Sequence, residues 1–200
     1  MAVYDLYHMQ KKLEKYLDEQ RFLHTLGVMY TCASLAMVHG YNLMDAQVAG
    51  LLHDSAKCIP NKKKLEMCKK HHIPVTEVER EHPFLLHAKL GAYIAKEKYH
   101  VEEESILSSI TYHTTGKPDM TKLEKIVYIA DYIEPMRDKA PNLDSIRRTA
   151  FQDLDECMYE ILRDTLSYLD GNPGEIDTMT RDAFEFYQKL HQERKQEVER

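Results

Sequence analysis

The fold is decided by the stretch Val48-Ala49-Gly50-Leu51-Leu52-His53-Asp54. Its apolar, glycine-containing run predicts a buried helix that ends at an imidazole and a carboxylate, those of His53 and Asp54. Burying these two groups together costs several kcal/mol unless hydrogen bonds or a cation compensate. Because neutral imidazole nitrogen and carboxylate oxygen both bind divalent metals, the pair predicts further ligands elsewhere in the chain.

Further candidate ligands lie on both sides of this pair. His24 lies upstream in the apolar, helical stretch 21–39, and Asp131 follows the apolar run 126–130. His87 and His113 fall between the pair and Asp131. A lone buried histidine is more often a satisfied core residue than a ligand, so the prediction depends on the ordered set and on its helical contexts.

The ordered set His24, His53-Asp54 and Asp131 resembles the HD phosphohydrolase superfamily. His87 and His113 lie where two-metal members of that superfamily carry their extra histidines. The segments RFLHTLGV (21–28), HDSAK (53–57), HTTG (113–116) and DYIEPMR (131–137) are similar to its bacterial YqeK-like branch, the symmetrical bis(5'-nucleosyl)-tetraphosphatases. This resemblance, which covers about residues 21–137, implies an enzyme that hydrolyses diadenosine tetraphosphate into two ADP.

The candidate ligands divide into two metal sites if all six of them bind. Asp54 is then the natural bridge between two metals about 3.5–4 Å apart, the separation found in two-metal hydrolytic sites. One site is then completed by His24, His53 and Asp131, and the other by His87 and His113. The ligand types suit Fe, Mn, Zn or Ni alike, and the resemblance favours two iron ions.

Cationic and hydroxyl side chains near the ligands are predicted to bind substrate phosphates. Lys57 follows His53 at i+4, so one helix would present both on one face, and Lys57 is predicted to be catalytic together with Asp54. Arg21 precedes His24 by three residues, and Arg137 follows Asp131; both could clamp phosphates bidentately. The polar loop that follows His113, Thr114-Thr115-Gly116, could hold a phosphate or the adjoining ribose through its hydroxyls and its exposed amide. The alternative interpretations are an ordinary surface lysine for Lys57 and a simple turn for this loop.

The reaction predicted from such a site is hydrolysis of a phosphoanhydride by a metal-activated water. The sequence has no P-loop, no G-x-S-x-G and no Rossmann glycine pattern, so acyl transfer and nicotinamide chemistry have no support. Two alternatives stay open: another HD phosphohydrolase, such as a nucleotidase or a cyclic-dinucleotide phosphodiesterase, and a non-catalytic nucleotide sensor. The absence of a Gly-Tyr-Pro tripeptide weakens the cyclic-dinucleotide option.

Composition favours a small-molecule partner and a cytoplasmic location. A net charge of -6 argues against a general nucleic-acid binder, so a polyanionic substrate must meet a local positive site. The four cysteines show no C-x-x-C spacing, which indicates reduced thiols. The charged N-terminus lacks an apolar signal core, and no run of ~18 apolar residues suggests a membrane span. The oligomeric state stays open, with a homodimer among the options.

The predicted fold class is all-α, a single-domain helical HD-domain bundle, because no segment alternates with period two. Residues 1–200 are expected to form one domain, with the HD core at about 18–140 and flanking helices in 1–17 and 141–200. Gly40 and Pro135 are predicted to end helices, and Asp45 and either Asp119 or Thr121 to begin them. The predicted helices are 4–18, 21–39, 45 to about 57, a solvated basic helix in 62–72, 84–99, 102–112, one that carries Asp131, 143–169 and 178–199, the last two separated by a turn at 170–174.

Overall fold

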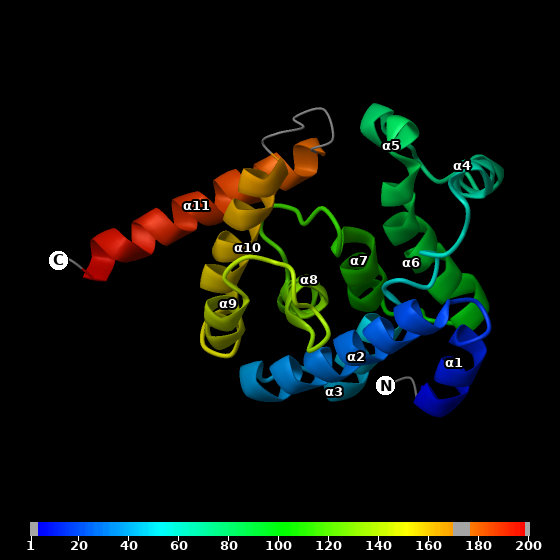
Figure 1. The fold of residues 1–200 in the computed structure, drawn as a ribbon, viewed down its shortest axis with the longest axis horizontal. Coiled ribbons are helices and arrows are strands. Elements are labelled where there is room, and N and C mark those ends of the chain that lie inside the picture. Colours follow the sequence, from blue (N-terminus) through cyan, green and yellow to red (C-terminus); the bar gives the residue numbers. More distant parts are fainter. Residues whose placement is uncertain (1–3, 170–176, 199–200) are drawn as a thin grey trace.

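Helices account for the regular secondary structure of the computed structural model, which describes residues 4–169 and 177–198 (Figure 1). No strand occurs in these residues, and the predicted all-α class is confirmed. In chain order the elements are α1 (Leu6–Leu13), α2 (Glu19–His39), α3 (Leu43–Leu52), α4 (Asn61–Lys70), α5 (Glu77–Glu81), the 3₁₀ helix η1 (Pro83–Leu86), α6 (His87–Tyr99), α7 (Glu104–Tyr112), α8 (Lys122–Ile133), α9 (Leu143–Ala150), α10 (Leu154–Leu169) and α11 (Thr178–Val198).

The centre of the fold is formed by α2, α3 and α8. Figure 1 shows α8 between α7 and α10, and α2 packs against both α3 and α8. Gly50 makes the close approach of α2 and α3 possible, since a Cβ atom there would lie 2.8 Å from Cys32 Sγ and 3.0 Å from Met29 Cα. The glycine of the apolar run is therefore a helix-packing residue, and it holds the end of α3 against α2.

Helix α2 is the most apolar long helix of the described chain. By length and composition it could cross a membrane. Half of its most apolar stretch is buried inside the protein, and Val28, Cys32 and Leu35 are fully buried in the core. Packing inside the bundle therefore accounts for the buried part of its apolar surface, whereas Leu23, Tyr30, Met37 and Val38 are exposed.

Two ends of the helices that carry Asp131 and His24, the start of α8 and the end of α2, follow from their cap residues. Thr121 begins α8 with a capping box, in which its hydroxyl accepts from the Glu124 N–H and the Glu124 carboxylate accepts from the Thr121 N–H. Of the two predicted caps, Thr121 is therefore the one used. Gly40 ends α2 in the left-handed conformation, with φ of 63°, as predicted.

The helix that carries the His-Asp pair is shorter than predicted. Asn42, not Asp45, caps α3, and the helix ends at Leu52 instead of continuing to about residue 57. The reason is local, because the His53 ring donates from Nδ1 to the Gly50 carbonyl, 2.7 Å away, and so competes for a carbonyl that a continuing helix would use. Residues 53–58 form consecutive turns instead.

Four other helix predictions need correction. The predicted helix 4–18 ends at Leu13, and residues 14–17 form turns and a bend. The predicted helix 143–169 is two helices, because the Asp153 carboxylate accepts from the N–H groups of Asp155 and Glu156 and begins α10. The predicted helix 84–99 begins with the 3₁₀ turn η1, so His87 opens α6. In the basic helix α4 most lysines are exposed as predicted, but Lys64 is buried. The turn predicted at 170–174 lies outside the described residues.

Candidate metal centre

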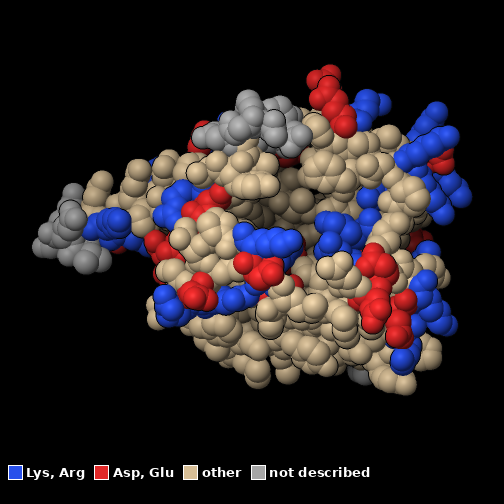
Figure 2. Space-filling model, viewed as in Figure 1, with Lys and Arg blue, Asp and Glu red and all other residues tan. Residues whose placement is uncertain are grey.

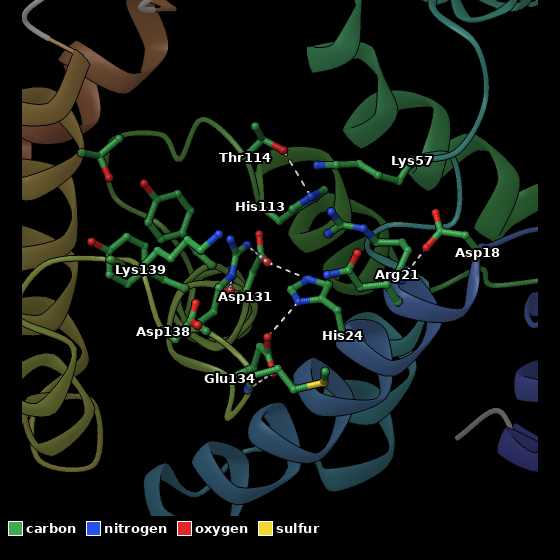
Figure 3. A pocket seen from close by; sticks show the side chains of 17 residues that line it. Asp18, Arg21, His24, Lys57, His113, Thr114, Asp131, Glu134, Asp138 and Lys139 are labelled. Carbon is green, nitrogen blue, oxygen red and sulfur yellow. Dashed lines mark hydrogen bonds and ion pairs between the residues drawn. The ribbon is translucent and has the colours of Figure 1, made fainter.

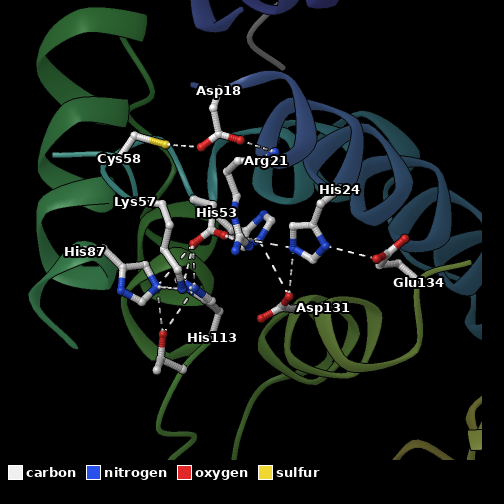
Figure 4. A network of polar contacts seen from close by, with 12 residues as sticks. Asp18, Arg21, His24, His53, Lys57, Cys58, His87, His113, Asp131 and Glu134 are labelled. Atoms are coloured by element: carbon white, nitrogen blue, oxygen red, sulfur yellow. Dashed lines mark hydrogen bonds and ion pairs between the residues drawn. The ribbon is translucent and has the colours of Figure 1, made fainter. Parts of the chain in front are cut away.

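The structure brings the six predicted ligands into one cluster, in which five are buried and Asp131 is partly exposed (Figure 4). They come from five places in the bundle, and five of the six stand within or beside a helix end. His24 lies in the second turn of α2, His53 and Asp54 follow the end of α3, His87 opens α6, His113 follows the end of α7, and Asp131 lies in the last turn of α8.

Asp54 divides the cluster into two halves. Its Oδ2 atom lies 3.5 Å from His53 Nε2 and 3.9 Å from His24 Nε2. Its Oδ1 atom lies 3.2 Å from His87 Nε2 and 3.6 Å from His113 Nε2. The two carboxylate oxygens thus face two sets of residues, which we call the His24 half (His24, His53, Asp131) and the His87 half (His87, His113).

The His24 half contains a second carboxylate. His24 Nε2 lies 3.0 Å and His53 Nε2 3.9 Å from Asp131 Oδ1. The ligand atoms of these three residues all lie within 4.8 Å of one another, and so do those of His53, Asp54 and His113. Both groups have the size and composition of a metal-binding set.

Hydrogen bonds at the outer ring nitrogens fix the orientation of all four imidazoles. Each Nδ1 faces an acceptor outside the cluster, so the proton belongs on Nδ1 and the Nε2 lone pair points inward. The acceptor of the His24 ring is the Glu134 carboxylate, at 3.0 Å. The other three rings donate to backbone carbonyls three residues earlier in the chain, those of Gly50 (to His53, 2.7 Å), Phe84 (to His87, 2.5 Å) and Ile110 (to His113, 2.7 Å).

Several inward-facing atoms have no hydrogen-bond partner within the described chain. They are His24 Nε2, His53 Nε2 and Asp54 Oδ1. Leaving a buried polar atom unsatisfied costs about 1–3 kcal/mol, and more for a charged group. Divalent cations bound in the two halves would satisfy all three, and imidazole nitrogen with carboxylate oxygen is a suitable donor set for them. The residues present therefore fit the metals that the resemblance implies.

The charges of the cluster suit a cation at neutral pH. Burial raises the pKa of the Asp54 carboxyl, but the neighbouring imidazoles, foremost that of His53, hold it well below its usual value. Burial also raises the pKa of Asp131, and the contact with His24 brings it below its usual value. Burial lowers the pKa of His87 to about 4. Both carboxylates are charged and His87 is neutral at pH 7, the states in which these groups bind metals.

Lys57 and Thr114 lie against the His87 half. Lys57 Nζ is 3.2 Å from His87 Nε2 and 3.6 Å from Asp54 Oδ1. Thr114 Oγ1 is 3.2 Å from Nε2 of both His87 and His113. Lys57 reaches this position from the turns after α3, not from the helical i+4 face that its spacing suggested.

The two predicted phosphate arginines each pair with one carboxylate of the cluster. Arg21 Nη1 lies 2.8 Å from Asp54 Oδ2, and Arg137 Nη2 lies 3.0 Å from Asp131 Oδ1. Both guanidinium groups remain partly exposed, so each has a face toward the cavity described next.

A cavity of about 490 Å³ opens over the cluster (Figure 3). Its cationic lining residues are Arg21, Lys57, Arg137 and Lys139. Figure 2 shows Lys and Arg side chains beside a hollow in this face of the molecule. Four cationic side chains are therefore available to a polyanionic substrate, and the same lining also contains the carboxylates of Asp18, Asp131, Glu134 and Asp138. The wall supplied by α8 and α10 includes Tyr128, Tyr132 and Thr165.

Only part of the predicted loop 114–116 reaches the cavity. Thr114 lines it, whereas Thr115 and Gly116 do not. The Gly116 N–H donates to the Tyr112 carbonyl at 2.9 Å, and the residue is buried with a left-handed φ of 66°. The predicted exposed glycine amide is therefore committed to ending α7, because its hydrogen bond closes the last turn.

Glu134 and Lys139 are cavity residues that the sequence analysis did not select. Lys139 offered no signal beyond its charge. Glu134 lies inside the segment 131–137 that carries the resemblance, directly before Pro135. Its spacing of three residues from Asp131 was the available sign that both carboxylates share one side of the end of α8.

The fold and the cluster define an HD-domain protein, and the chain belongs to the HD domain family, which matches residues 21–136. It is 37% identical over 157 residues to the symmetrical bis(5'-nucleosyl)-tetraphosphatase of Bacillus subtilis, covering 78% of this chain and 83% of that protein. A protein of the same name from Staphylococcus aureus is 33% identical over 173 residues, 86% of this chain and 88% of its own length. The predicted family is therefore confirmed.

A solved structure supports the same assignment. It is a protein from Clostridium acetobutylicum described as a predicted HD superfamily hydrolase involved in NAD metabolism. The two structures superpose with a TM-score of 0.89 at 32% sequence identity, over 94% of this chain and 100% of the other. The similarity therefore extends beyond the HD core to nearly the whole helical bundle.

Proposed function

We propose that this protein is a metal-dependent hydrolase that cleaves diadenosine tetraphosphate symmetrically into two ADP. The names of the relatives from Bacillus subtilis and Staphylococcus aureus supply the substrate and the symmetry of cleavage. One observation in this chain carries the chemistry: the two oxygens of buried Asp54 face two separate sets of imidazole nitrogens. That arrangement is what a carboxylate bridging two metals requires.

Two divalent metal ions are the proposed cofactors. The His24 half would hold one and the His87 half the other, with Asp54 shared between them. When bound, such a pair supplies a nucleophilic hydroxide at neutral pH and neutralises charge on a phosphoryl group. We propose iron on the strength of the resemblance, and the same donor atoms accept manganese, zinc or nickel.

The cationic side chains around the cavity are proposed to bind the polyphosphate. Lys57 lies 3.6 Å from Asp54 Oδ1, close enough to reach the phosphoryl group that reacts, and would stabilise the charge that develops on it. Arg21, Arg137 and Lys139 line the same cavity and would hold the neighbouring phosphates. Thr114 would donate its hydroxyl to one of them.

The remaining cavity wall is proposed to receive one nucleoside. Tyr128 and Tyr132 offer aromatic surface and phenol groups beside Thr165, and aromatic side chains combine apolar area with a polar handle. With one ADP moiety placed there and its β-phosphate at the metals, attack at that phosphorus would release the second ADP. The distance between the nucleoside wall and the metals would thus set the position of the cut.

The wider setting is also a proposal. We propose that residues 1–200 act as one domain with its HD core at about 18–140, and that the protein works in the cytoplasm on small nucleotides and does not bind nucleic acid. Four free cysteines support a reducing compartment, and a net charge of -6 disfavours binding to a phosphate backbone.

The products formed in ¹⁸O-labelled water test this function. Protein reconstituted with iron or manganese under reducing conditions should convert diadenosine tetraphosphate into ADP as the sole nucleotide. One label per substrate cleaved should appear on a β-phosphate. ATP and AMP in equal amounts would contradict the symmetrical cut while keeping a metal hydrolase. No cleavage by fully metallated protein would favour the other HD phosphohydrolases or the sensor, and a panel of nucleotides and cyclic dinucleotides would separate those two.

A further inference from the structure

The outer hydrogen bond of His24 differs from those of the other three imidazoles. His53, His87 and His113 donate from Nδ1 to backbone carbonyls of their own chain segment, three residues earlier. His24 donates instead to the side chain of Glu134, 110 residues away and directly after the end of α8 (Figure 4). Its orientation therefore depends on a single side chain that can be replaced without altering the backbone of α2.

Glu134 is held in place so that only one of its oxygens is available to His24. Its carboxylate is buried, with 2% of the side chain exposed. Oε1 accepts from His24 Nδ1, and Oε2 accepts from the Met136 N–H at 2.8 Å. The residue precedes Pro135, which favours the extended conformation that it adopts (ψ of 153°) at the end of α8. Arg147 also donates to its carbonyl at 3.1 Å, which anchors the backbone.

Helix α2 is shaped to admit this carboxylate. Gly27 lies three residues after His24, on the same side of the helix, and a Cβ atom there would come within 2.6 Å of Glu134 Oε2. Such a distance is not tolerated between real atoms. The Glu134 carboxylate occupies the space that the glycine leaves. Helix α2 therefore supplies both the imidazole that donates to Glu134 and the glycine that makes room for it.

We infer that Glu134 is a positioning residue that orients the His24 imidazole and strengthens its bond to the metal of the His24 half. This inference rests on the proposed function. A carboxylate acceptor fixes the Nδ1–H tautomer, keeps the Nε2 lone pair directed into the cluster and makes the imidazole a stronger donor. The effect is selective, because no contact between Glu134 and the His87 half is found among the described residues.

The test is metal titration of the chelator-stripped protein with Mn²⁺ by calorimetry, together with the absorption spectrum of the Co²⁺ form. Glu134→Ala should weaken one of the two binding events ~10- to 100-fold and leave the other unchanged, as expected for the loss of an outer-shell partner. The Co²⁺ spectrum should change with it. Glu134→Gln, which keeps one acceptor oxygen but loses the charge, should give a smaller loss. Gly27→Ala should resemble Glu134→Ala because it displaces the carboxylate.

Glu124 offers a matched control on the same helix. It is also a buried carboxylate of α8, but it bonds to Ser108, Thr121 and Lys117. Glu124→Gln should lower the melting temperature and leave both Mn²⁺ affinities and the Co²⁺ spectrum unchanged. If Glu134→Ala does not fold, the Gln and Gly27→Ala variants carry the test.

Two results would overturn the inference while the proposed function stands. One is wild-type affinity for both metals in the Glu134→Gln and Gly27→Ala variants. The other is equal weakening of both metals in the Glu134 variants and in Glu124→Gln, which would indicate a general structural role. A wild-type protein that binds no metal would instead overturn the proposed function, and this inference with it.

Discussion

The two halves of the cluster differ in their candidate ligands and in the charged side chains beside them. The His24 half contains the carboxylate of Asp131, and a second carboxylate, Glu134, stands behind its imidazole. The His87 half has two imidazoles, shares Asp54, and has the Lys57 ammonium 3.2 Å from one ring nitrogen. Each half also has cationic neighbours, Arg21 and Arg137 at the carboxylates of the first and Lys57 beside the second, so charge alone does not separate the halves. The His24 half offers three candidate ligands besides Asp54, and the His87 half offers two. The comparison teaches that one metal should bind tightly and the other weakly.

Removing the shared residue should have the largest effect. Asp54→Ala takes away the carboxylate that faces both halves, so we expect loss of both metals and of all hydrolysis of diadenosine tetraphosphate. Metal analysis and ADP chromatography measure the two effects. Asp45→Ala, at the other end of α3, is the control and should retain both. Two metals in the Asp54 variant would show that the halves are independent and that no bridge exists.

Removing a ligand from one half should leave the other occupied. We expect His113→Ala to retain about one metal per chain, in the His24 half, because only Asp54 and His87 remain to hold the other metal. Hydrolysis should fall to background if both metals are needed. Metal analysis after dialysis against a low concentration of free metal measures the stoichiometry. If His113→Ala or His87→Ala still held two metals, the replaced residue would not be a ligand.

Lys57→Met should affect catalysis and metal binding in opposite directions. A charge-assisted phosphate contact contributes about 1.5–3 kcal/mol, so kcat/KM should fall roughly 10- to 150-fold. The affinity for the weaker metal should rise, because the ammonium 3.2 Å from His87 Nε2 is gone. Steady-state kinetics and Mn²⁺ titration report the two effects, with exposed Lys62→Met as the control. Weaker binding of the second metal would mean that Lys57 supports the His87 half and does not oppose it.

The smallest effect is expected from the cap of α8. Thr121→Ala removes the hydroxyl that accepts from the Glu124 N–H and should cost about 1 kcal/mol of unfolding free energy. Denaturant unfolding of the metal-free protein measures the loss. Both metal affinities should stay at the wild-type values, because the cap lies at the far end of the helix from Asp131. A selective change in the His24 half would show that metal affinity follows the stability of α8 as a whole.

The sequence predicts which His and Asp side chains cluster better than it predicts their surroundings. His53, His113 and Asp131 stand at or near the ends of apolar helical runs, so periodicity alone locates them near the core. Helix ends are harder to predict where a side chain competes for a backbone carbonyl, as the His53 ring does at Gly50. The end of α3 at Leu52 and the turns that deliver Lys57 could therefore not be derived from spacing.

Contacts between distant elements lie beyond the reach of sequence pattern. The pairs Arg21 with Asp54 and His24 with Glu134 exist because α2 packs against both α3 and α8. The need for a glycine at position 27 is visible only in the packed structure, where Glu134 at the end of α8 lies against it. A glycine after a loop threonine indicates a turn, yet only the packed structure shows that the amide of Gly116 is used to close α7.

The metal content of protein purified without chelator tests the central claim, that six side chains form one dinuclear centre. After reconstitution with excess iron or manganese under reducing conditions, elemental analysis should give close to two metals per chain. Stepwise removal by a chelator of graded strength should then release them in two separate stages, the weaker metal first. A reproducible value of one or less would contradict the dinuclear centre.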